Sequence, residues 1–216
     1  MKYKVAIFDM DGTILYTLQD IVDSMNRVLK KNHLPETSLS AMRVYIGNGI
    51  MNEVRRSVPE NTSEEMIQRV FEDFNNDYAI HCSDTTKPYE GISELLRELR
   101  DMGILTAVVS NKGDYAVQEL MKQYFDGLFD AGVGEKEGIE RKPAPDTVYA
   151  VLDALHMDKS EAVYIGDSEV DIETAKNAGM DCILVSWGYR DKPDMYAKGA
   201  SIIVDTMEEL KMEITK

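Results

Sequence analysis

Short runs of β-branched and apolar residues alternate with helical patterns along most of this chain, and this alternation restricts its fold more than any other feature. Five runs predict buried strands, at residues 5–8, 104–109, 162–165, 182–185 and 202–204. Between them, apolar residues recur at helical spacing, as at Ile92, Leu95, Leu96 and Leu99. Repeated strand–helix–strand units predict an α/β fold, a Rossmann-like, doubly wound parallel sheet with helices on both faces.

One segment interrupts the alternation. Between about Leu18 and Ile80, apolar residues follow a helical period and no strand pattern occurs. One stripe begins at Leu18, and a second, which ends at Tyr78, is preceded by the capping-box pattern Thr62-x-x-Glu65. We therefore expect an inserted α-helical cap domain over residues 16–85 and an α/β core built from residues 1–15 and 86–216. The turn-rich residues 82–91 are expected to form the return linker.

The charge of the chain restricts its partners. With 24 basic and 39 acidic residues, the formal net charge is −15, which would repel a nucleic-acid backbone or an anionic membrane surface. No stretch approaches the roughly 20 apolar residues of a membrane span. Cys82 and Cys182 form no paired metal or redox motif. The expectation is a cytoplasmic protein with no nucleic-acid or membrane partner, as a monomer or homodimer.

Polar and charged residues follow the predicted strands at their carboxyl ends, where open α/β sheets bind ligands. The sequences at these points are Asp9-Met10-Asp11-Gly12-Thr13, Ser110-Asn111-Lys112, Lys142-Pro143 and Gly166-Asp167-Ser168, with Asp171 one helical turn later. Carboxylates gathered at one edge raise one another's pKa and oppose folding unless a cation joins them. Mg²⁺ suits such a set because it prefers hard oxygen ligands and keeps positions for water and phosphate. An isolated Asp-Gly turn would be the simpler interpretation of the first segment alone.

Taken together, these residues make the chain resemble the haloacid dehalogenase superfamily, specifically its phosphoglycolate-phosphatase-like branch with a helical cap. Asp9 to Thr13 match the first motif of the family, Ser110 the second and Lys142 the third. The fourth motif is matched by Gly166-Asp167 together with Asp171. The resemblance covers essentially the whole chain.

The resemblance implies a mechanism. Asp9 would attack phosphorus and form an aspartyl-phosphate, while Asp11 would protonate the leaving oxygen and later activate water. Ser110 and Lys142 would complete the catalytic set. Mg²⁺ would be held by Asp9, the Asp11 carbonyl and Asp167, with Asp171 acting through a bound water. The substrate phosphate would be surrounded by Gly12, Thr13, Asn111 and Lys112.

The cap is expected to choose the substrate. Its segment Ile46-Gly47-Asn48-Gly49 resembles a loop that faces the active site in phosphoglycolate phosphatases, although a plain turn between helices would have a similar sequence. Three arginines, Arg43, Arg55 and Arg56, flank the loop. Arg56 is the first choice to pair with a substrate carboxylate, and a solvated helix face is the alternative interpretation.

The sequence thus predicts a Mg²⁺-dependent phosphatase for a small phosphorylated metabolite similar to phosphoglycolate. A pyrophosphatase, a nucleotide or sugar phosphatase, or a β-phosphoglucomutase would share the same motifs, and a non-catalytic binding protein is a further alternative. Tyr16 departs from the acidic residue that the family often has at this position. That departure concerns the cap hinge or the substrate group, not the reaction.

Overall fold

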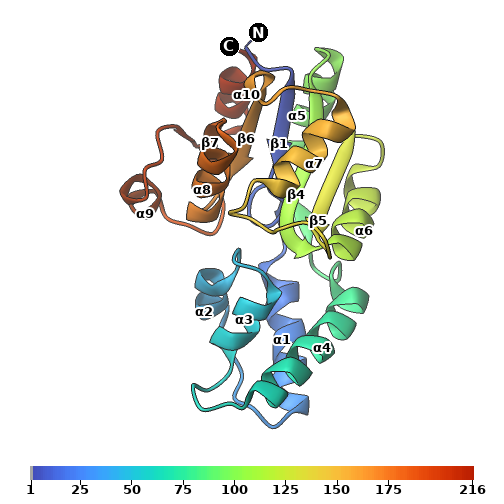
Figure 1. The fold of residues 1–216 in the computed structure, drawn as a ribbon, viewed down its shortest axis with the longest axis vertical. Coiled ribbons are helices and arrows are strands. Elements are labelled where there is room, and N and C mark those ends of the chain that lie inside the picture. The colour runs from blue at the N-terminus through green and yellow to red at the C-terminus, as the bar shows by residue number, and fades with distance from the viewer. Residues whose placement is uncertain (1) are drawn as a thin grey trace.

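The computed structural model describes residues 2–216, which form two lobes (Figure 1). The larger lobe contains a parallel sheet with helices on both faces, as the sequence predicts. The smaller lobe consists of four helices, α1 to α4, which the chain builds between the first and second long strands. We call this smaller lobe the cap and the larger lobe the core.

Six parallel strands form the main sheet in the order β5-β4-β1-β6-β7-β8. Their bounds are β1 Val5–Phe8, β4 Leu105–Gly113, β5 Ala131–Glu135, β6 Ala162–Gly166, β7 Asp181–Val185 and β8 Ile203–Val204. Strand β1 pairs with β4 on one side and β6 on the other, with Phe8 opposite Val108 and Ile165. The strand order reverses at β1, so the crevice beyond its carboxyl end is where such a sheet binds ligands.

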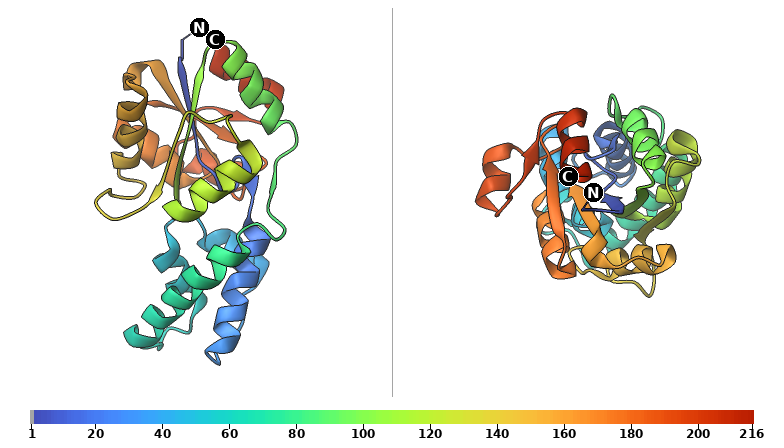
Figure 2. Two further views of the ribbon diagram at one scale, coloured as in Figure 1. Left: turned by 90° about the vertical axis from the view of Figure 1, so that its right-hand side faces the viewer. Right: turned by 90° about the horizontal axis from the view of Figure 1, so that it is seen from above.

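Alternation along β1 divides the core into two layers of side chains. Val5 and Ile7 face one layer, and Ala6 and Phe8 face the other. The first layer is covered by α7 and α8, and the second by α5, α6 and α10 (Figure 2). Because both faces are covered, the strand is fully apolar, as expected for a central strand of a parallel sheet.

The helices account for most of the remaining chain. In the cap they are α1 Leu18–Lys31, α2 Leu39–Tyr45, α3 Ile50–Ser57 and α4 Glu64–His81. In the core they are α5 Ile92–Asp101, α6 Asp114–Phe125, α7 Asp146–Leu155, α8 Glu169–Ala178, α9 Lys192–Ala197 and α10 Met207–Thr215, with a short 3₁₀ helix at Lys159–Glu161. Within the described part of the chain, no helix is long and apolar enough to cross a membrane.

The two lobes are joined by a short antiparallel pair of strands, β2 Leu15–Tyr16 and β3 Lys87–Pro88. The sequence did not predict these strands, because two residues are too few to show a period. Tyr16, the residue that departs from the family pattern, lies in β2 and packs edge-on against Tyr89 and Tyr189. An aromatic residue therefore occupies the hinge between core and cap.

Two further local expectations differ from the structure. The helix α4 begins after Ser63, whose hydroxyl accepts a hydrogen bond from the backbone N–H of Met66, so the predicted cap at Thr62 was one residue early. Strand β5 was not predicted, because Gly132 and Gly134 dilute its apolar pattern. A Cβ on Gly134 would lie 2.6 Å from the carbonyl oxygen of Lys112, so this strand needs glycine to approach its neighbour.

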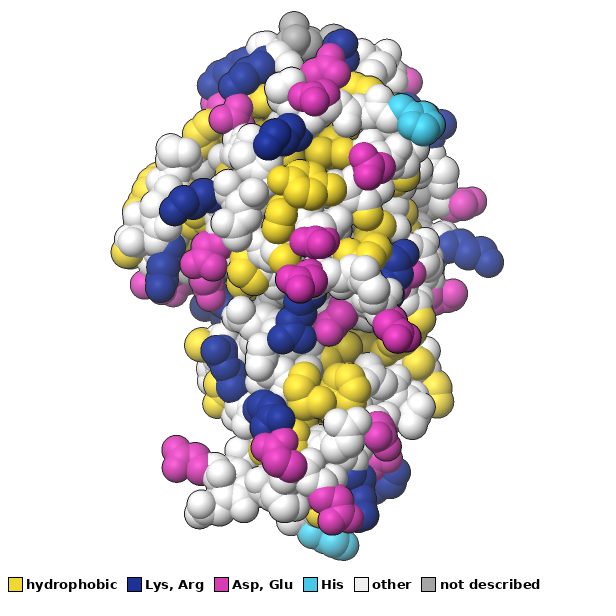
Figure 3. Space-filling model, in the orientation of Figure 1, with side chains coloured by type: hydrophobic (Ala, Val, Ile, Leu, Met, Phe, Trp, Pro, Cys, Tyr) yellow, Lys and Arg dark blue, Asp and Glu magenta, His cyan; other side chains and the backbone are white. Residues whose placement is uncertain are grey.

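Acidic and basic side chains are interspersed over the face of the molecule drawn in Figure 3, and neither sign forms a large continuous patch there. Since the chain carries a formal net charge of −15, this distribution spreads a surplus of acidic groups over both lobes. Mixed charge with a large net value favours solubility.

Candidate active site

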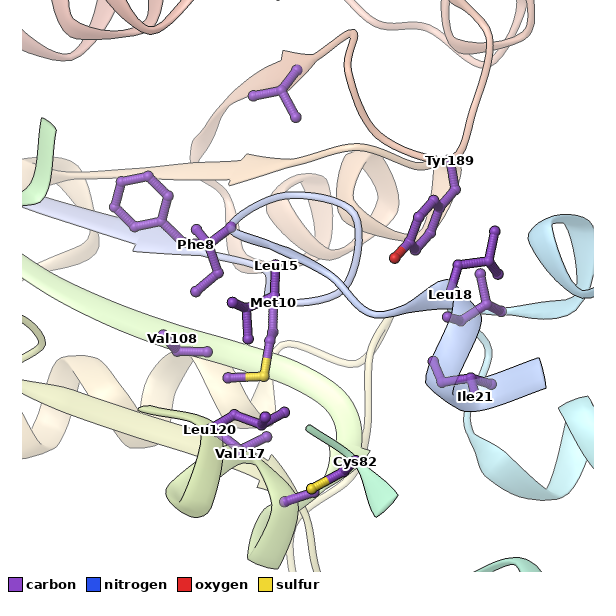
Figure 4. Packing of buried hydrophobic residues seen from close by; sticks show 14 of the residues in the cluster. Phe8, Met10, Leu15, Leu18, Ile21, Cys82, Val108, Val117, Leu120 and Tyr189 are labelled. Atoms are coloured by element: carbon purple, nitrogen blue, oxygen red, sulfur yellow. The ribbon is translucent and has the colours of Figure 1, made fainter. Parts of the chain in front are cut away.

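Asp9 and Asp11 follow β1, and the intervening Met10 anchors them. Successive side chains of an extended segment point to opposite sides, so Met10 turns into the core, where it is fully buried near Val108 and Leu120 (Figure 4). The two carboxylates then turn the other way, into a cavity between core and cap. The spacing Asp-x-Asp after a buried strand therefore presents both acids to one site.

Asp9 is held by two donors on the same oxygen. Its Oδ1 accepts hydrogen bonds from the backbone N–H of Met10 at 2.7 Å and from Nζ of Lys142 at 2.9 Å. Among residues 2–216, no donor is directed at Oδ2. The side chain is oriented by the protein, while one oxygen remains free to react with a ligand in the cavity.

Lys142 joins Asp9 to Asp171. Its Nζ lies 2.8 Å from Oδ1 of Asp171 and 3.1 Å from the Tyr164 hydroxyl. Burial lowers the pKa of Lys142, but the carboxylates of Asp171 and Asp9 more than offset it and raise that pKa well above its usual value. The lysine is therefore a fixed positive charge beside the free oxygen of Asp9.

Asp171 is completely buried and uses both of its oxygens within the protein. Oδ1 accepts from Lys142, and Oδ2 accepts from the backbone N–H groups of Asp167 and Ser168 and from the Ser168 hydroxyl. The Ser168 and Asp171 side chains form a capping box at the start of α8. This arrangement fixes the loop that carries Asp167.

The three acids Asp9, Asp167 and Asp171 each offer a carboxylate oxygen within 4.8 Å of the others, and all three are buried. Burial raises the pKa of Asp9 to about 7, with Lys142 opposing this effect and Asp171 adding to it. Burial together with the Asp171 and Asp9 charges also raises the pKa of Asp167 well above its usual range. One lysine does not balance three carboxylates, so the donor set fits a hard divalent cation such as Mg²⁺.

Asp167 is held close to the loop that follows β1. A Cβ on Gly12, whose φ is +84°, would lie 2.4 Å from Oδ2 of Asp167, so only glycine allows this approach. The backbone N–H of Tyr189 donates to the same oxygen at 2.6 Å. Thr13 lies behind this turn, and its buried hydroxyl has no hydrogen-bond partner among the described residues.

Asp11 contacts a different set of groups. Its Oδ1 accepts from the Thr17 hydroxyl at 2.5 Å and lies 3.2 Å from Nζ of Lys112. Lys112 also donates to the Tyr78 hydroxyl of the cap at 2.6 Å and stands 4.3 Å from the centre of that ring. The structure thus places Lys112 between Asp11 and the cap, where it can orient the acid.

Strand β4 supplies Ser110, Asn111 and Lys112 through an irregular carboxyl end. Its register against β5 shifts between Val109 and Gly113, and all three side chains are buried. The Asn111 amide donates to the carbonyl oxygens of Gly47 in the cap and Lys142 in the core, both at 2.9 Å. Asn111 therefore connects the cap loop to the backbone of Lys142.

A cavity of about 30 Å³ lies between these groups and the cap. Its core wall contains Asp9, Asp11, Ser110, Asn111, Lys112, Lys142, Asp167, Ser168, Tyr189 and Arg190. Its cap wall contains Ile21, Ile46, Gly47, Ile50, Glu53, Phe74 and Tyr78. The core and the cap thus leave only a narrow space between them, enough for about two water molecules.

The cap residues expected to bind substrate divide into two groups. Gly47 lines the cavity, whereas Asn48 and Gly49 lie just outside it. Arg56 lies on the exposed side of α3 and reaches only the Val44 carbonyl oxygen, at 3.4 Å. Its position offers no support for the expectation that it meets a substrate carboxylate.

Glu53, Tyr78 and Arg190 also line the cavity, although no sequence motif indicated a role for them there. The burial of Glu53 could have been predicted from the sequence, because Glu53 shares one face of α3 with Ile50, Val54 and Ser57, and this face is buried. An acid on a buried stripe calls for a partner or a function. Arg190 follows the last long strand and gave no comparable signal.

Residues 6–185 match the family described as haloacid dehalogenase-like hydrolase. The phosphoglycolate phosphatase of Aquifex aeolicus is 34% identical, covering 86% of each chain. The N-acetylmuramic acid 6-phosphate phosphatase of Pseudomonas aeruginosa is 28% identical over 97% of this chain and 94% of that protein. A crystal structure from Lactobacillus delbrueckii subsp. bulgaricus, of a candidate phosphoglycolate phosphatase, has a TM-score of 0.94 and 40% identity over 99% of both chains.

These similarities extend over both lobes and include the strand ends that carry Asp9, Ser110 and Asp167. The resemblance found in the sequence motifs is therefore confirmed at the level of the family and of the fold. The chain belongs to the haloacid dehalogenase-like hydrolases, among relatives that are named as phosphatases.

Proposed function

We propose that this protein is a Mg²⁺-dependent phosphatase that hydrolyses small phosphate monoesters through an aspartyl-phosphate on Asp9. The observation that supports this most directly is the state of the Asp9 carboxylate. Oδ1 is fixed by Met10 and Lys142, whereas Oδ2 receives no hydrogen bond from the described residues, and the side chain lines the cavity. A fixed carboxylate with one free oxygen is suited to nucleophilic attack on phosphorus.

The surrounding residues would stabilise charge and transfer protons. Lys142 and the Ser110 hydroxyl, both at the cavity wall, would stabilise the negative charge of the phosphoryl oxygens during transfer. Asp11 would donate a proton to the leaving oxygen and then accept one from the attacking water. Lys112 and Thr17 hold Asp11 in place for both steps.

The metal would be held by Asp9, Asp167 and the main-chain carbonyl of Asp11, beside Asp171. When bound, Mg²⁺ would neutralise charge on the acids and on the substrate phosphate. Asp171 would act mainly by positioning Lys142 and the loop that carries Asp167, because both of its oxygens already accept protein hydrogen bonds.

Phosphoglycolate is a first substrate to test because relatives at 27% and 34% identity are named phosphoglycolate phosphatases. A sugar phosphatase is a second candidate, since one relative over nearly the full chain is named for a sugar phosphate. A pyrophosphatase, a nucleotide phosphatase and a β-phosphoglucomutase would use the same core residues, so a substrate panel must separate them.

The test is hydrolysis of an aryl phosphate and a panel of phosphorylated metabolites by the wild type and by Asp9→Asn. We expect activity that a chelator removes and Mg²⁺ restores, and essentially none in Asp9→Asn, since an amide is a poor nucleophile. Asp153→Asn, which changes an exposed acid on α7 in the same way, is the matched control. Activity that persists in Asp9→Asn, or in excess chelator, would contradict the proposal.

A further inference from the structure

The reaction geometry decides which side of the cavity the leaving group occupies. In-line displacement places the leaving oxygen on the side of phosphorus opposite the attacking oxygen. Asp9 belongs to the core, so the rest of the substrate points to the cap. The cap wall of the cavity therefore determines which leaving groups are accepted.

That wall is apolar with few exceptions. Ile21, Ile46, Ile50 and Phe74 contribute hydrocarbon surface, and the Tyr78 hydroxyl already accepts a hydrogen bond from Lys112. Glu53 is the one ionisable cap side chain, besides the Tyr78 phenol, among the described residues that line the cavity. A leaving group that enters here meets one cap carboxylate in a largely apolar wall, near the paired charge of Lys112 on the core side.

Glu53 has unused hydrogen-bonding capacity. The residue is 6% exposed, and its Oε1 accepts only a long hydrogen bond, 3.3 Å, from the backbone N–H of Gly47. Within residues 2–216, Oε2 receives no hydrogen bond. Burying a carboxylate is costly when its oxygens lack donors, so a donor supplied by the substrate would be favourable.

The basic residues that line the cavity are not available to bind an anionic leaving group, because each already has a partner in the protein. Lys112 and Lys142 are paired with acids, as described above. Arg190 donates to Glu169 at 2.9 Å and to the carbonyl oxygen of Ile46 at 3.0 Å. A substrate carboxylate facing the cap would meet Glu53 without a free positive charge among the described lining residues.

We propose that Glu53 selects the leaving group by accepting a hydrogen bond from it, and that it disfavours leaving groups that carry a carboxylate. This inference rests on the proposed function and narrows its substrate class. The preferred substrates are phosphate monoesters of small alcohols that bear a hydroxyl or ammonium donor near the ester. Esters such as phosphoglycolate are poorer substrates of this chain.

The experiment compares kcat/KM for three esters of similar size with Mg²⁺ present. Glycerol 3-phosphate carries hydroxyls, phosphoethanolamine an ammonium group and phosphoglycolate a carboxylate. An assay at about pH 8 keeps Glu53 ionised, because burial raises the pKa of its carboxyl to about 7. We expect the wild type to prefer at least one donor-bearing ester over phosphoglycolate, and the better of the two identifies the donor.

The variant Glu53→Gln keeps the size of the side chain and removes its charge. It should reduce the ratio of kcat/KM for the preferred ester to that for phosphoglycolate by about 10- to 100-fold, the value of a charge-assisted hydrogen bond. Glu65→Gln, an equivalent change at an exposed residue of α4, should leave this ratio unchanged.

Two results would overturn the inference: a wild-type preference for phosphoglycolate, or a ratio that Glu53→Gln does not alter. The wild-type preference is measured without a variant, so this test remains valid even if Glu53→Gln folds poorly. Hydrolysis of p-nitrophenyl phosphate, measured alongside, separates the two proposals. If p-nitrophenyl phosphate is not hydrolysed, both the proposed function and this inference are refuted. If it is hydrolysed but the wild type prefers phosphoglycolate, only the inference is refuted.

Discussion

At the scale of single residues, the site depends on how charges are balanced inside the protein. Three buried acids surround Lys142, and two of them, Asp9 and Asp171, contact it directly. Buried carboxylates without enough positive charge hold protons that the unfolded chain would release. Without a metal, this group of acids therefore destabilises the native protein where the pH is high enough to ionise the unfolded chain.

This balance predicts how stability depends on pH. The folded pKa of Asp9 is about 7, above its usual value of 3.8, so the native state keeps a proton that the unfolded state has lost between these values. In chelator, the free energy of unfolding should fall as pH rises from about 4 to about 7, by roughly 1.4 kcal/mol per pH unit for each such group. Urea unfolding at several pH values measures this slope.

Mg²⁺ provides the control for the same measurement. Because a divalent cation stabilises the ionised acids of the native state, we expect saturating Mg²⁺ to reduce the slope or reverse it. Equal slopes with chelator and with Mg²⁺ would show that Asp9 and Asp167 do not form a metal site.

At the scale of elements, the strand ends bring the candidate site residues together. Residues at the carboxyl ends of β1, β4 and β6 meet because these strands are neighbours in the sheet. The sequence could predict this convergence, since buried strands and the polar residues after them are both visible as local patterns. It could not show that the carboxylate of Asp171 accepts hydrogen bonds from Lys142 and Ser168, because the bond from Lys142 joins distant segments of the chain.

Elements with weak local patterns were harder to predict. Strand β5 contains Gly132 and Gly134, and the structure requires glycine at position 134 for close approach to the backbone of β4. The hinge strands β2 and β3 are fixed by pairing between residues more than seventy positions apart, such as Leu15 and Pro88. Only the tertiary structure specifies such contacts.

Asn111 connects a core strand to the cap, and this predicts the effect of its loss. Asn111→Asp keeps the shape but removes both amide donors, so the carbonyl groups of Gly47 and Lys142 lose their partner. We expect a cost of about 1–3 kcal/mol for the closed cap, and hydrogen exchange in residues 46–50 at least about 10-fold faster. Mass spectrometry of exchange at peptide resolution makes this measurement.

Asn75→Asp is the matched control for this variant. Asn75 also donates to a carbonyl oxygen, that of Phe71, but within α4, and among the described residues its side chain makes no hydrogen bond to the core. It should leave exchange in residues 46–50 nearly unchanged. The link between core and cap would be refuted by equal acceleration in both variants, or by none in Asn111→Asp.

At the scale of the whole molecule, we expect closure of the cap to limit the size of the substrate. The cavity between core and cap has a volume of only about 30 Å³, so we expect the cap to open for entry and to close over a compact leaving group. We expect the hinge strands and the Asn111 contacts to control this motion. Closure excludes water and strengthens the charge interactions within the site.

A size limit on substrates follows. A blocked phosphoserine amide and the same phosphoserine inside a long peptide present identical chemistry at phosphorus. We expect hydrolysis of the small amide to exceed that of the peptide by at least about 100-fold, because the peptide prevents the cap from closing. Release of inorganic phosphate from each compound gives the comparison, and similar rates would mean that catalysis does not need closure.

The family and the α/β fold with its helical insertion could be predicted from the sequence. The motifs occur in a fixed order along the chain, and the strand and helix patterns are local. The chemistry of the cap wall could not be predicted in the same way. Arg56 seemed suited to a substrate carboxylate in sequence, yet α3 turns it to the solvent and turns Glu53 inward. A helix presents only one face to a site, and which face it presents depends on packing against the rest of the molecule.

The most direct test of the account is to trap the phosphorylated enzyme. The protein is mixed with its best substrate and Mg²⁺, quenched in acid, digested and analysed by mass spectrometry. We predict a phosphoryl group on the peptide that contains Asp9, formed by the wild type within one turnover and absent from Asp9→Asn. Phosphate hydrolysis with no phosphorylated Asp9, or with the phosphoryl group on another residue, would contradict the mechanism.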